Sequence, residues 1–372
     1  MTKKECTITY PRKRFARAVV RALGRMVLPL AFELEISGRD RFPQGGPLII
    51  VGNHVAAMEG VLMIVFTPWQ VELLGTADIP VEKITEIAGR LFGFIPINRG
   101  HMDRPAMNKA LDVLRQNGVI GIFPEGGIWD AGAMRPQKGV AWLSYRASAP
   151  VLPVGFSGTL GAIGKALKMQ RPRLEMNVGD LISAARLPEG RARKVYFEEF
   201  SALVMGAVRD LLPAADETLR PVVDERFELE IAARDTSGET VSHPMGLEIT
   251  HKTALAKLLH RPTILKIFRA NLRLPIDPLQ NLDSERDGKK VADAVELMLN
   301  YLREENPYLL AYRFGPREGR AMQDGLEELL ALARWAARSG LALEVTPTRR
   351  YYSPEQEKEI VQIKQGAFGG WM

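Results

Sequence analysis

Residues 47–60, "PLIIVGNHVAAMEG", place a short apolar run directly before a histidine and a helix-like segment. The run over 47–53 is almost continuously apolar, which is typical of a strand buried on both faces of a sheet. From about Ala56 the pattern becomes helical. We therefore expect a strand that ends near Gly52, a loop that carries His54, and a helix with Glu59 in its first turn, where the helix dipole favours a carboxylate.

Further apolar runs continue this arrangement along the chain. They cover residues 94–98, 119–125 and 151–156. Helical patterns at 104–118 and 139–149 alternate with them. Short buried strands that alternate with helices are typical of a mostly parallel sheet with helices on both faces. We predict an α/β domain over residues 33–213, closed by a helix at 193–213, with functional groups beyond the carboxyl ends of its strands.

The five positions between His54 and Glu59 decide how these two side chains can meet. On one helix this spacing is a rotation of about 500°, so the side chains would point to different faces. They can meet if His54 precedes the helix, and an imidazole held by a carboxylate can act as a general base. The alternative is an ordinary helix start with a solvated glutamate. The pair by itself does not decide between the two.

Four short motifs occur in order along the predicted sheet. They are Asn53, His54 and Glu59; Arg99 at the end of "FIPINRG" (94–100); "FPEGG" (123–127), with Phe123, Pro124, Glu125 and Gly126; and Pro153 in "VLPVGF" (151–156). In order and approximate spacing they resemble the four blocks of the glycerolipid acyltransferases, a family that includes lysophosphatidic acid and glycerol-3-phosphate acyltransferases. The resemblance covers roughly residues 34–180.

The resemblance implies a role for each matched residue. His54 would be the general base on an acceptor hydroxyl that attacks the thioester of acyl-CoA or acyl carrier protein, and Glu59 would orient its imidazole. No acyl-enzyme is needed, and no metal or cofactor is expected besides the acyl donor as co-substrate. The implied substrate contacts are Asn53, Arg99 on the acceptor phosphate, Glu125, Gly126 and Gly127 in the acceptor pocket, Lys138 in the basic stretch "MRPQKG", and Pro153 near the donor.

Several of these residues also have ordinary structural explanations. Gly126 and Gly127 lack β-carbons, so their N–H groups can approach an anion closely, but they can equally form a tight turn. Arg99 can be a solvated surface residue, and Pro153 can end a strand.

Two departures from the family pattern bear on the chemistry. Glu59 replaces the family's aspartate and adds a methylene, and we expect activity to survive this change. Gly127, Ile128 and Trp129 stand where the family has threonine, arginine and a small polar residue. This change weakens phosphate recognition. Either Arg135 or Lys138 supplies the missing charge, or the acceptor is more apolar than lysophosphatidic acid.

The whole chain has the composition of a globular protein with an anionic partner. Its 372 residues suggest two domains, and it is 46% hydrophobic and 25% charged. The net charge of +6 fits nucleic acid, an anionic membrane or a phosphorylated substrate. We expect no nucleic acid partner, because no nucleic-acid-binding motif is recognised. The single cysteine, Cys6, cannot form an internal disulfide, which indicates a cytosolic protein.

The amino-terminal 32 residues predict a basic amphipathic helix. On one side of the helix, arginines recur at helical spacing, namely Arg14, Arg17, Arg21 and Arg25. The opposite side is apolar and contains Phe15, Val19, Leu23, Met26 and Leu30. We expect a helix that lies on an anionic membrane surface with its arginines at the head groups, kinked or ended by Pro29. The alternative is a surface helix packed on its own domain. With no apolar run of ~18 residues, the predicted location is cytoplasmic, bound peripherally to the inner face of the membrane.

Past residue 180 the resemblance fades. A linker at 213–221 would lead to a second α+β domain over 222–372, in which we recognise no motif. We expect a hairpin from 225–234 and 239–250, then a helix at 287–305, a strand at 306–315, a helix at 322–340 and a strand at 341–347. His243, His251 and His260 fit no common metal-binding spacing.

The sequence thus predicts an acyltransferase that moves a fatty acyl group from acyl-CoA or acyl carrier protein to a lysophospholipid hydroxyl, at a membrane lipid surface. Two alternatives remain. One is transfer to a non-phosphorylated lipid or small molecule, and the other is a lipid-binding relative without turnover.

Overall fold

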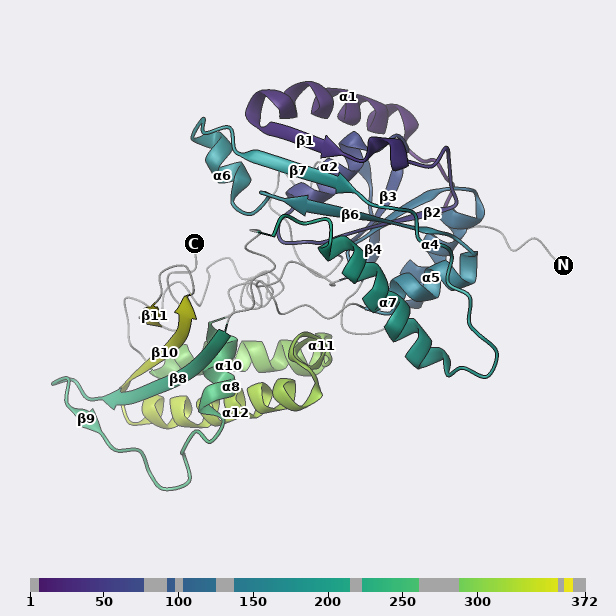
Figure 1. Cartoon of the computed structure of the whole chain (residues 1–372). Coiled ribbons are helices and arrows are strands. Elements are labelled where there is room, and N and C mark those ends of the chain that lie inside the picture. Colours follow the sequence, from purple (N-terminus) through teal and green to yellow (C-terminus); the bar gives the residue numbers. More distant parts are fainter. Residues whose placement is uncertain are drawn as a thin grey trace. The chain divides into compact units, whose positions relative to one another are not determined.

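The computed structural model of the chain describes residues 7–76, 92–97, 103–124, 137–214, 223–260, 288–353 and 358–363. These residues fall into two compact units (Figure 1). The first contains the described residues up to 214, and the second contains those from 223 onward. The linker expected at 213–221 lies largely outside the described residues.

The first unit is built on a seven-stranded sheet in the order β1-β7-β6-β2-β5-β3-β4. Its strands are β1 (Glu33–Ser37), β2 (Leu48–Gly52), β3 (Val71–Thr76), β4 (Ile95–Ile97), β5 (Val119–Ile122), β6 (Val151–Ser157) and β7 (Arg173–Val178). All neighbouring pairs are parallel except β6 and β7. The predicted mostly parallel sheet is therefore confirmed. The sequence pattern missed β1, β3 and β7; β1 and β7 are less completely buried than β2.

Helices cover both faces of this sheet, as expected from its central strands. They are α2 (Met58–Phe66), α4 (Arg104–Arg115), α5 (Gly139–Ala147), α6 (Ala162–Leu167) and α7 (Arg193–Arg209), besides α1 (Arg14–Ala31) at the amino terminus. Alternate residues of β2 point to opposite faces. Ile49 and Val51 pack with α4, α5 and α7, whereas Leu48 and Ile50 pack with α2. Because β2 is packed on both faces, the loop that follows it, which carries His54, has a fixed position.

Local signals explain where α4 begins and ends. The carboxylate of Asp103 accepts a hydrogen bond from the N–H of Ala106 at 3.0 Å and caps the helix, whose first turn contains Pro105. The chain leaves the helix through Asn117, at φ 56°, and Gly118. The helix ends at Arg115, somewhat before the predicted residue 118.

Helix α1 packs its arginines against its own unit. Arg17 is fully buried and binds both carboxylate oxygens of Glu72 on β3, at 2.5 and 2.8 Å. Arg21 donates to the carbonyl of Thr67, and Arg25 donates to the carbonyls of Val65 and Thr67 at 2.9 and 3.3 Å. Burial lowers the pKa of Arg21, and the charge of Arg25 adds to this effect.

The expectation that these three arginines face lipid head groups is therefore wrong. The carboxyl end of α2 leaves carbonyl groups without partners inside their own helix, and the guanidinium groups supply the missing donors. Gly24 allows the two helices to approach, because a β-carbon there would lie 2.7 Å from a methyl group of Val65. The helix also runs two residues beyond Pro29, which does not end it.

The second unit is a four-stranded antiparallel sheet in the order β11-β10-β8-β9, with helices packed on it (Figure 1). Its elements are β8 (Val223–Arg234), β9 (Thr240–Val241), α8 (Lys252–Leu259), α10 (Gly288–Asn300), a π-helical turn (Tyr301–Glu305), α11 (Leu309–Phe314), α12 (Pro316–Arg338), β10 (Ala342–Ser353) and β11 (Lys358–Ile363). The predicted α+β character is confirmed.

Two predictions for this unit need correction. The strand expected at 306–315 is the helix α11, because a short apolar run fits either structure and its packing on α12 decides here. A β-carbon at Gly319 would lie 2.6 Å from the backbone of Leu310 and Ala311, which shows how closely the two helices meet. The expected hairpin is also short, since only Ala233 and Arg234 pair with β9.

Candidate active site

Three neighbouring strands of the first unit bring the candidate residues to one edge of the sheet. β6, β2 and β5 are adjacent and parallel, so their carboxyl ends lie at the same edge. His54 follows β2, Phe123 follows β5, and Thr159 follows β6. This edge is where parallel α/β sheets commonly place their reactive groups.

His54 and Glu59 are in contact. The Nδ1 atom of His54 lies 3.2 Å from Oε2 of Glu59. The contact forms because His54 lies in the loop before α2, which begins at Met58, while Glu59 lies in the first turn of the helix. Glu59 is fully buried, so the alternative of a solvated glutamate does not hold. The His54 side chain is 20% exposed.

The carboxylate of Glu59 is held by further donors besides His54. The N–H of Ala56 lies 3.0 Å from each carboxylate oxygen, and the hydroxyl of Thr159 donates to Oε1. These groups are donors, and an ionised carboxylate, which can only accept hydrogen bonds, gives each of them an acceptor. Thr159 is itself buried, so the carboxylate is fixed by donors from both the loop before α2 and the loop after β6.

The loop that carries His54 is fixed on its other side by Asn53. Its Nδ2 atom donates to the carbonyl of Phe156 and its Oδ1 atom accepts from the N–H of the same residue, both at 2.8 Å. The side-chain amide thus continues the pairing between β2 and β6 beyond Gly52. The imidazole of His54 stacks on the ring of Phe123, with centroids 4.3 Å apart and an interplanar angle of 15°.

This arrangement sets the protonation pattern of the imidazole. An ionised carboxylate can only accept hydrogen bonds, so its contact with Nδ1 requires the proton on that atom. The lone pair of the neutral ring is then on Nε2, the nitrogen that can take a proton from a hydroxyl group. His54 and Glu59 therefore have the geometry of a general base and the acid that orients it.

The family model described as Acyltransferase matches residues 33–157, which contain this pair, its loop and most of the sheet. Residues 33–157 are an acyltransferase-family domain. The resemblance to the glycerolipid acyltransferases is confirmed for this domain.

Individual proteins are similar to the chain over the same part. A 1-acyl-sn-glycerol-3-phosphate acyltransferase of Borreliella burgdorferi is 29% identical over 150 residues, which cover 39% of this chain and 60% of that protein. The chain thus spans about three fifths of the length of this relative. The crystal structure of a 1-acyl-sn-glycerophosphate (LPA) acyltransferase from Thermotoga maritima is 16% identical, covers 54% of this chain and 79% of that one, and aligns with a TM-score of 0.41.

Other motif residues of the acyltransferase domain lie outside the described residues. They are Arg99, Glu125, Gly126 and Gly127, and Arg135 is outside as well. The carbonyl of Pro124, in the third motif, accepts a hydrogen bond from the N–H of Gln137, in the basic stretch, at 2.9 Å. The roles of the four motif residues stay predictions.

Lys138 and Pro153 are described, and neither contacts His54 or Glu59 through a hydrogen bond. Lys138 is the N-cap residue of α5 and forms an ion pair with Glu198 on α7, which lowers the pKa of Glu198. Pro153 is buried within β6 rather than at its end, and its carbonyl accepts from the N–H of Gly179, just past the end of β7. A proline is tolerated there because its missing N–H lies on the side where β7 has ended.

Thr159 and the stacking role of Phe123 were not predicted. Phe123 was matched only as a motif residue, and no feature of the sequence associated it with His54. Thr159 had one usable signal in the sequence, a hydroxyl group three residues after the fourth apolar run. Its 100-residue separation from Glu59 explains why only the fold pairs them.

A second acid–imidazole pair occurs in the second unit and has a structural role. Glu328 of α12 contacts Nδ1 of His251 at 3.0 Å and also accepts from the N–H groups of Thr250 and His251, at 2.9 and 3.1 Å. These N–H groups lie at the start of α8 and have no acceptor within that helix. Their hydrogen bonds to Glu328 therefore join α8 to α12. In the described part of the chain, no group of three or more His, Cys, Asp or Glu residues is placed to hold a metal ion.

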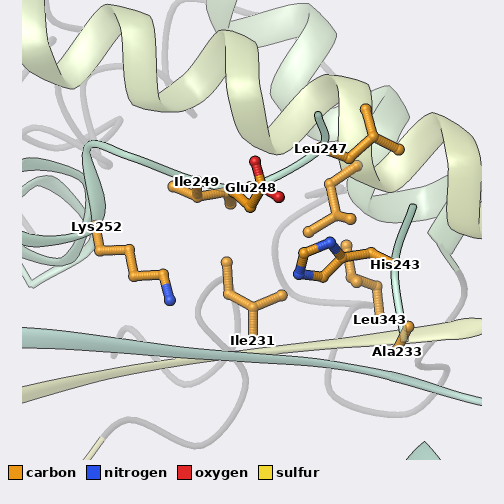
Figure 2. Close-up of a pocket in the computed structure, with 9 residues that line it drawn as sticks. Ile231, Ala233, His243, Leu247, Glu248, Ile249, Lys252 and Leu343 are labelled. Carbon is orange, nitrogen blue, oxygen red and sulfur yellow. The ribbon is translucent and has the colours of Figure 1, made fainter. Parts of the chain in front are cut away.

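The second unit also has a small surface pocket (Figure 2). Its volume is about 120 Å³, and apolar residues such as Ile231, Leu247 and Leu343 line it beside His243, Glu248 and Lys252. Ligand pockets usually measure about 300–1,000 Å³. We assign no substrate to this pocket because it is smaller than that range.

Proposed function

We propose that the chain transfers a fatty acyl group from a thioester donor, acyl-CoA or acyl carrier protein, to the hydroxyl of a lysophospholipid such as lysophosphatidic acid. The single observation that carries the proposal is the contact between His54 and the buried Glu59 at the carboxyl edge of an acyltransferase-family domain.

The chemistry follows from the protonation pattern of the pair. Nε2 of His54 takes the proton of the acceptor hydroxyl as its oxygen attacks the thioester carbonyl carbon. Glu59 stabilises the imidazolium that forms. When the tetrahedral intermediate collapses, the carbon–sulfur bond breaks and the imidazolium returns the proton to the leaving thiolate. The products are an ester and a free thiol, without an acyl-enzyme.

The apolar side of α1 supports a membrane as the place of reaction. Large side chains on this side are exposed, among them Phe15 (84%), Met26 and Leu30, while three arginines on the other side are bound to the protein. An exposed apolar stripe on a surface helix is the kind of surface that inserts at a lipid interface. No helix in the described residues is long and apolar enough to cross a membrane.

The test incubates the purified full chain with labelled acyl-CoA or acyl carrier protein and a panel of lysolipids with and without a phosphate. Both the free thiol and the acylated lipid are measured. We expect the two products in equal amounts, with His54→Ala reducing turnover ~10²–10⁴-fold, which is the usual effect of losing a general base. His243→Ala, an exposed histidine of the second unit, is the matched control and should have wild-type turnover.

The other outcomes separate the alternatives. Thiol without acylated lipid would indicate hydrolysis and contradict the proposal. Lipid binding without turnover would indicate a non-catalytic relative. Acylation only of acceptors that lack a phosphate would support the alternative suggested by Ile128 and Trp129.

A further inference from the structure

We propose that residues 160–169 form a second lipid-contacting element, here called the α6 segment, which inserts into the same anionic phospholipid monolayer as α1. The inference deepens the proposed function and rests on it, because it states how this domain is held at a lipid surface. It concerns a segment to which the sequence pattern gave no role.

The α6 segment exposes several large apolar side chains. Leu167 is 81% exposed and Met169 is 89% exposed, and Leu160 and Ile163 are more than half exposed. The segment is held in place at its base, since Ala162 is buried in the core shared with α2 and β6. The exposed side chains are therefore presented by a fixed part of the fold.

The charges around the α6 segment favour an anionic lipid surface as its partner. Lys165, Lys168 and Arg171 are exposed beside the apolar side chains. No aspartate or glutamate occurs between Gly158 and Leu174. Apolar side chains flanked by basic ones are the pattern of segments that lie in an anionic membrane interface. An acidic lipid head group matches the cations, whereas a purely apolar protein partner would leave them without counter-charges.

Two contacts connect the α6 segment to α1 and to the active site. Two residues past the end of the segment, the guanidinium of Arg171 donates to the carbonyl of Pro29 in the last turn of α1, at 3.1 Å. At its other end the segment follows directly after Thr159, whose hydroxyl binds Glu59. Insertion of the segment would thus place the loop after β6, and with it the His54–Glu59 pair, at the lipid surface where a lysolipid acceptor resides.

The experiment measures insertion at single positions, without using activity. An environment-sensitive fluorophore is attached to Met169→Cys in full-length chain whose only other cysteine is removed by Cys6→Ser. The matched control carries the label at Met245→Cys, an equally exposed methionine of the second unit. Each protein is mixed with vesicles of phosphatidylcholine alone or with phosphatidylglycerol added. We expect a blue shift only for the label at residue 169, and only when the anionic lipid is present.

A second measurement uses Leu167→Glu with Met169→Glu in co-sedimentation with the anionic vesicles. We expect about hundredfold weaker binding, because burial of each of the two large apolar side chains contributes roughly a tenfold change in affinity. Met245→Glu should bind like the wild type. Full binding by the double variant, or an unshifted label at residue 169 on vesicle-bound protein, would show that α1 alone contacts lipid. A blue shift without vesicles, at concentrations where the chain self-associates, would assign the segment to a second copy.

Turnover with a short-chain, water-soluble acceptor separates this inference from the proposed function. Turnover without a fluorescence shift of the label at residue 169 would contradict the lipid contact of the α6 segment and support the acyltransferase activity. A fluorescence shift without any turnover would support the lipid contact and contradict the acyltransferase activity.

Discussion

The imidazole of His54 lies 3.2 Å from a carboxylate that the fold buries completely. Glu59 is joined to the rest of the unit by donors from two places, the N–H of Ala56 and the hydroxyl of Thr159. All three partners of this carboxylate are donors. The site therefore depends on a negative charge at residue 59 and on the length of its side chain, and both can be tested separately.

Glu59→Gln removes the charge while keeping the shape. An amide nitrogen cannot accept from His54, Ala56 or Thr159, so at least one donor loses its partner and the imidazole tautomer is no longer enforced. We expect the kcat to fall ~10²–10⁴-fold. Glu59→Asp keeps the charge but is one methylene shorter, and we expect a smaller loss of about tenfold, because the shortened carboxylate cannot reach all its donors. Equal kcat for both variants would contradict a role of the charge, and the unfolding midpoints of both are measured as a control.

Thr159→Val tests whether the hydroxyl positions Glu59. The variant keeps the volume and removes the donor, so we expect a decrease of about tenfold or more in kcat, as for loss of a hydrogen bond to a charged group, with little change in the KM of either substrate. Thr159→Ser should restore activity. If Val and Ser variants behave alike, Thr159 serves only packing.

Arg99→Ala tests the contact with the acceptor that the motif implies. We expect it to raise the KM of a phosphorylated acceptor more than that of the acyl donor, because one charge-assisted contact to a phosphate is lost. Initial rates with each substrate varied in turn give the two constants. The opposite pattern would assign Arg99 to phosphates of the donor.

Arg17→Met tests the anchoring of α1. The guanidinium binds Glu72 and the carbonyls of Phe92 and Gly93, and neither ionic side chain is exposed to solvent. The variant leaves the buried Glu72 with the partly exposed Arg12, at 2.9 Å, as its ionic partner. We therefore expect the free energy of unfolding to fall by about 3 kcal/mol, the lower end of the range for breaking a buried ion pair. Chemical denaturation measures the change. Arg14→Met, an exposed arginine of the same helix, should change the stability by less than about 0.5 kcal/mol.

Much of the first unit was predictable because its signals are local. Runs such as 47–53 and 119–125 are apolar enough to be strands buried on both faces, and helix-capping residues such as Asp103 mark boundaries within a few positions. In the second unit the same kind of run, at 306–315, was misleading. The helix α11, packed on α12, buries Leu309 and Leu310 as completely as a strand would.

The helix α1 shows where periodicity is insufficient. Its pattern correctly separated a basic from an apolar side, but nothing in the periodicity states which side faces the protein. The carbonyl groups at the end of α2 and the carboxylate of Glu72 decided this, and their contacts with the arginines span at least 40 residues of sequence. Basic sides usually face water, so the prediction followed the common case.

The sequence alone determined the central strands β2, β5 and β6, because each is marked by a short, nearly continuous apolar run. It also gave the order of the motifs, and it allowed the contact of His54 with Glu59 without deciding it. Only the tertiary structure decided that Asn53 joins β6, that Phe123 stacks on the imidazole and that Thr159 holds the carboxylate. These contacts join strands β2, β5 and β6, which are neighbours in the sheet and about 70 to 100 residues apart in the chain. The physical reason is that sheet order, unlike strand formation, depends on how distant segments pack together.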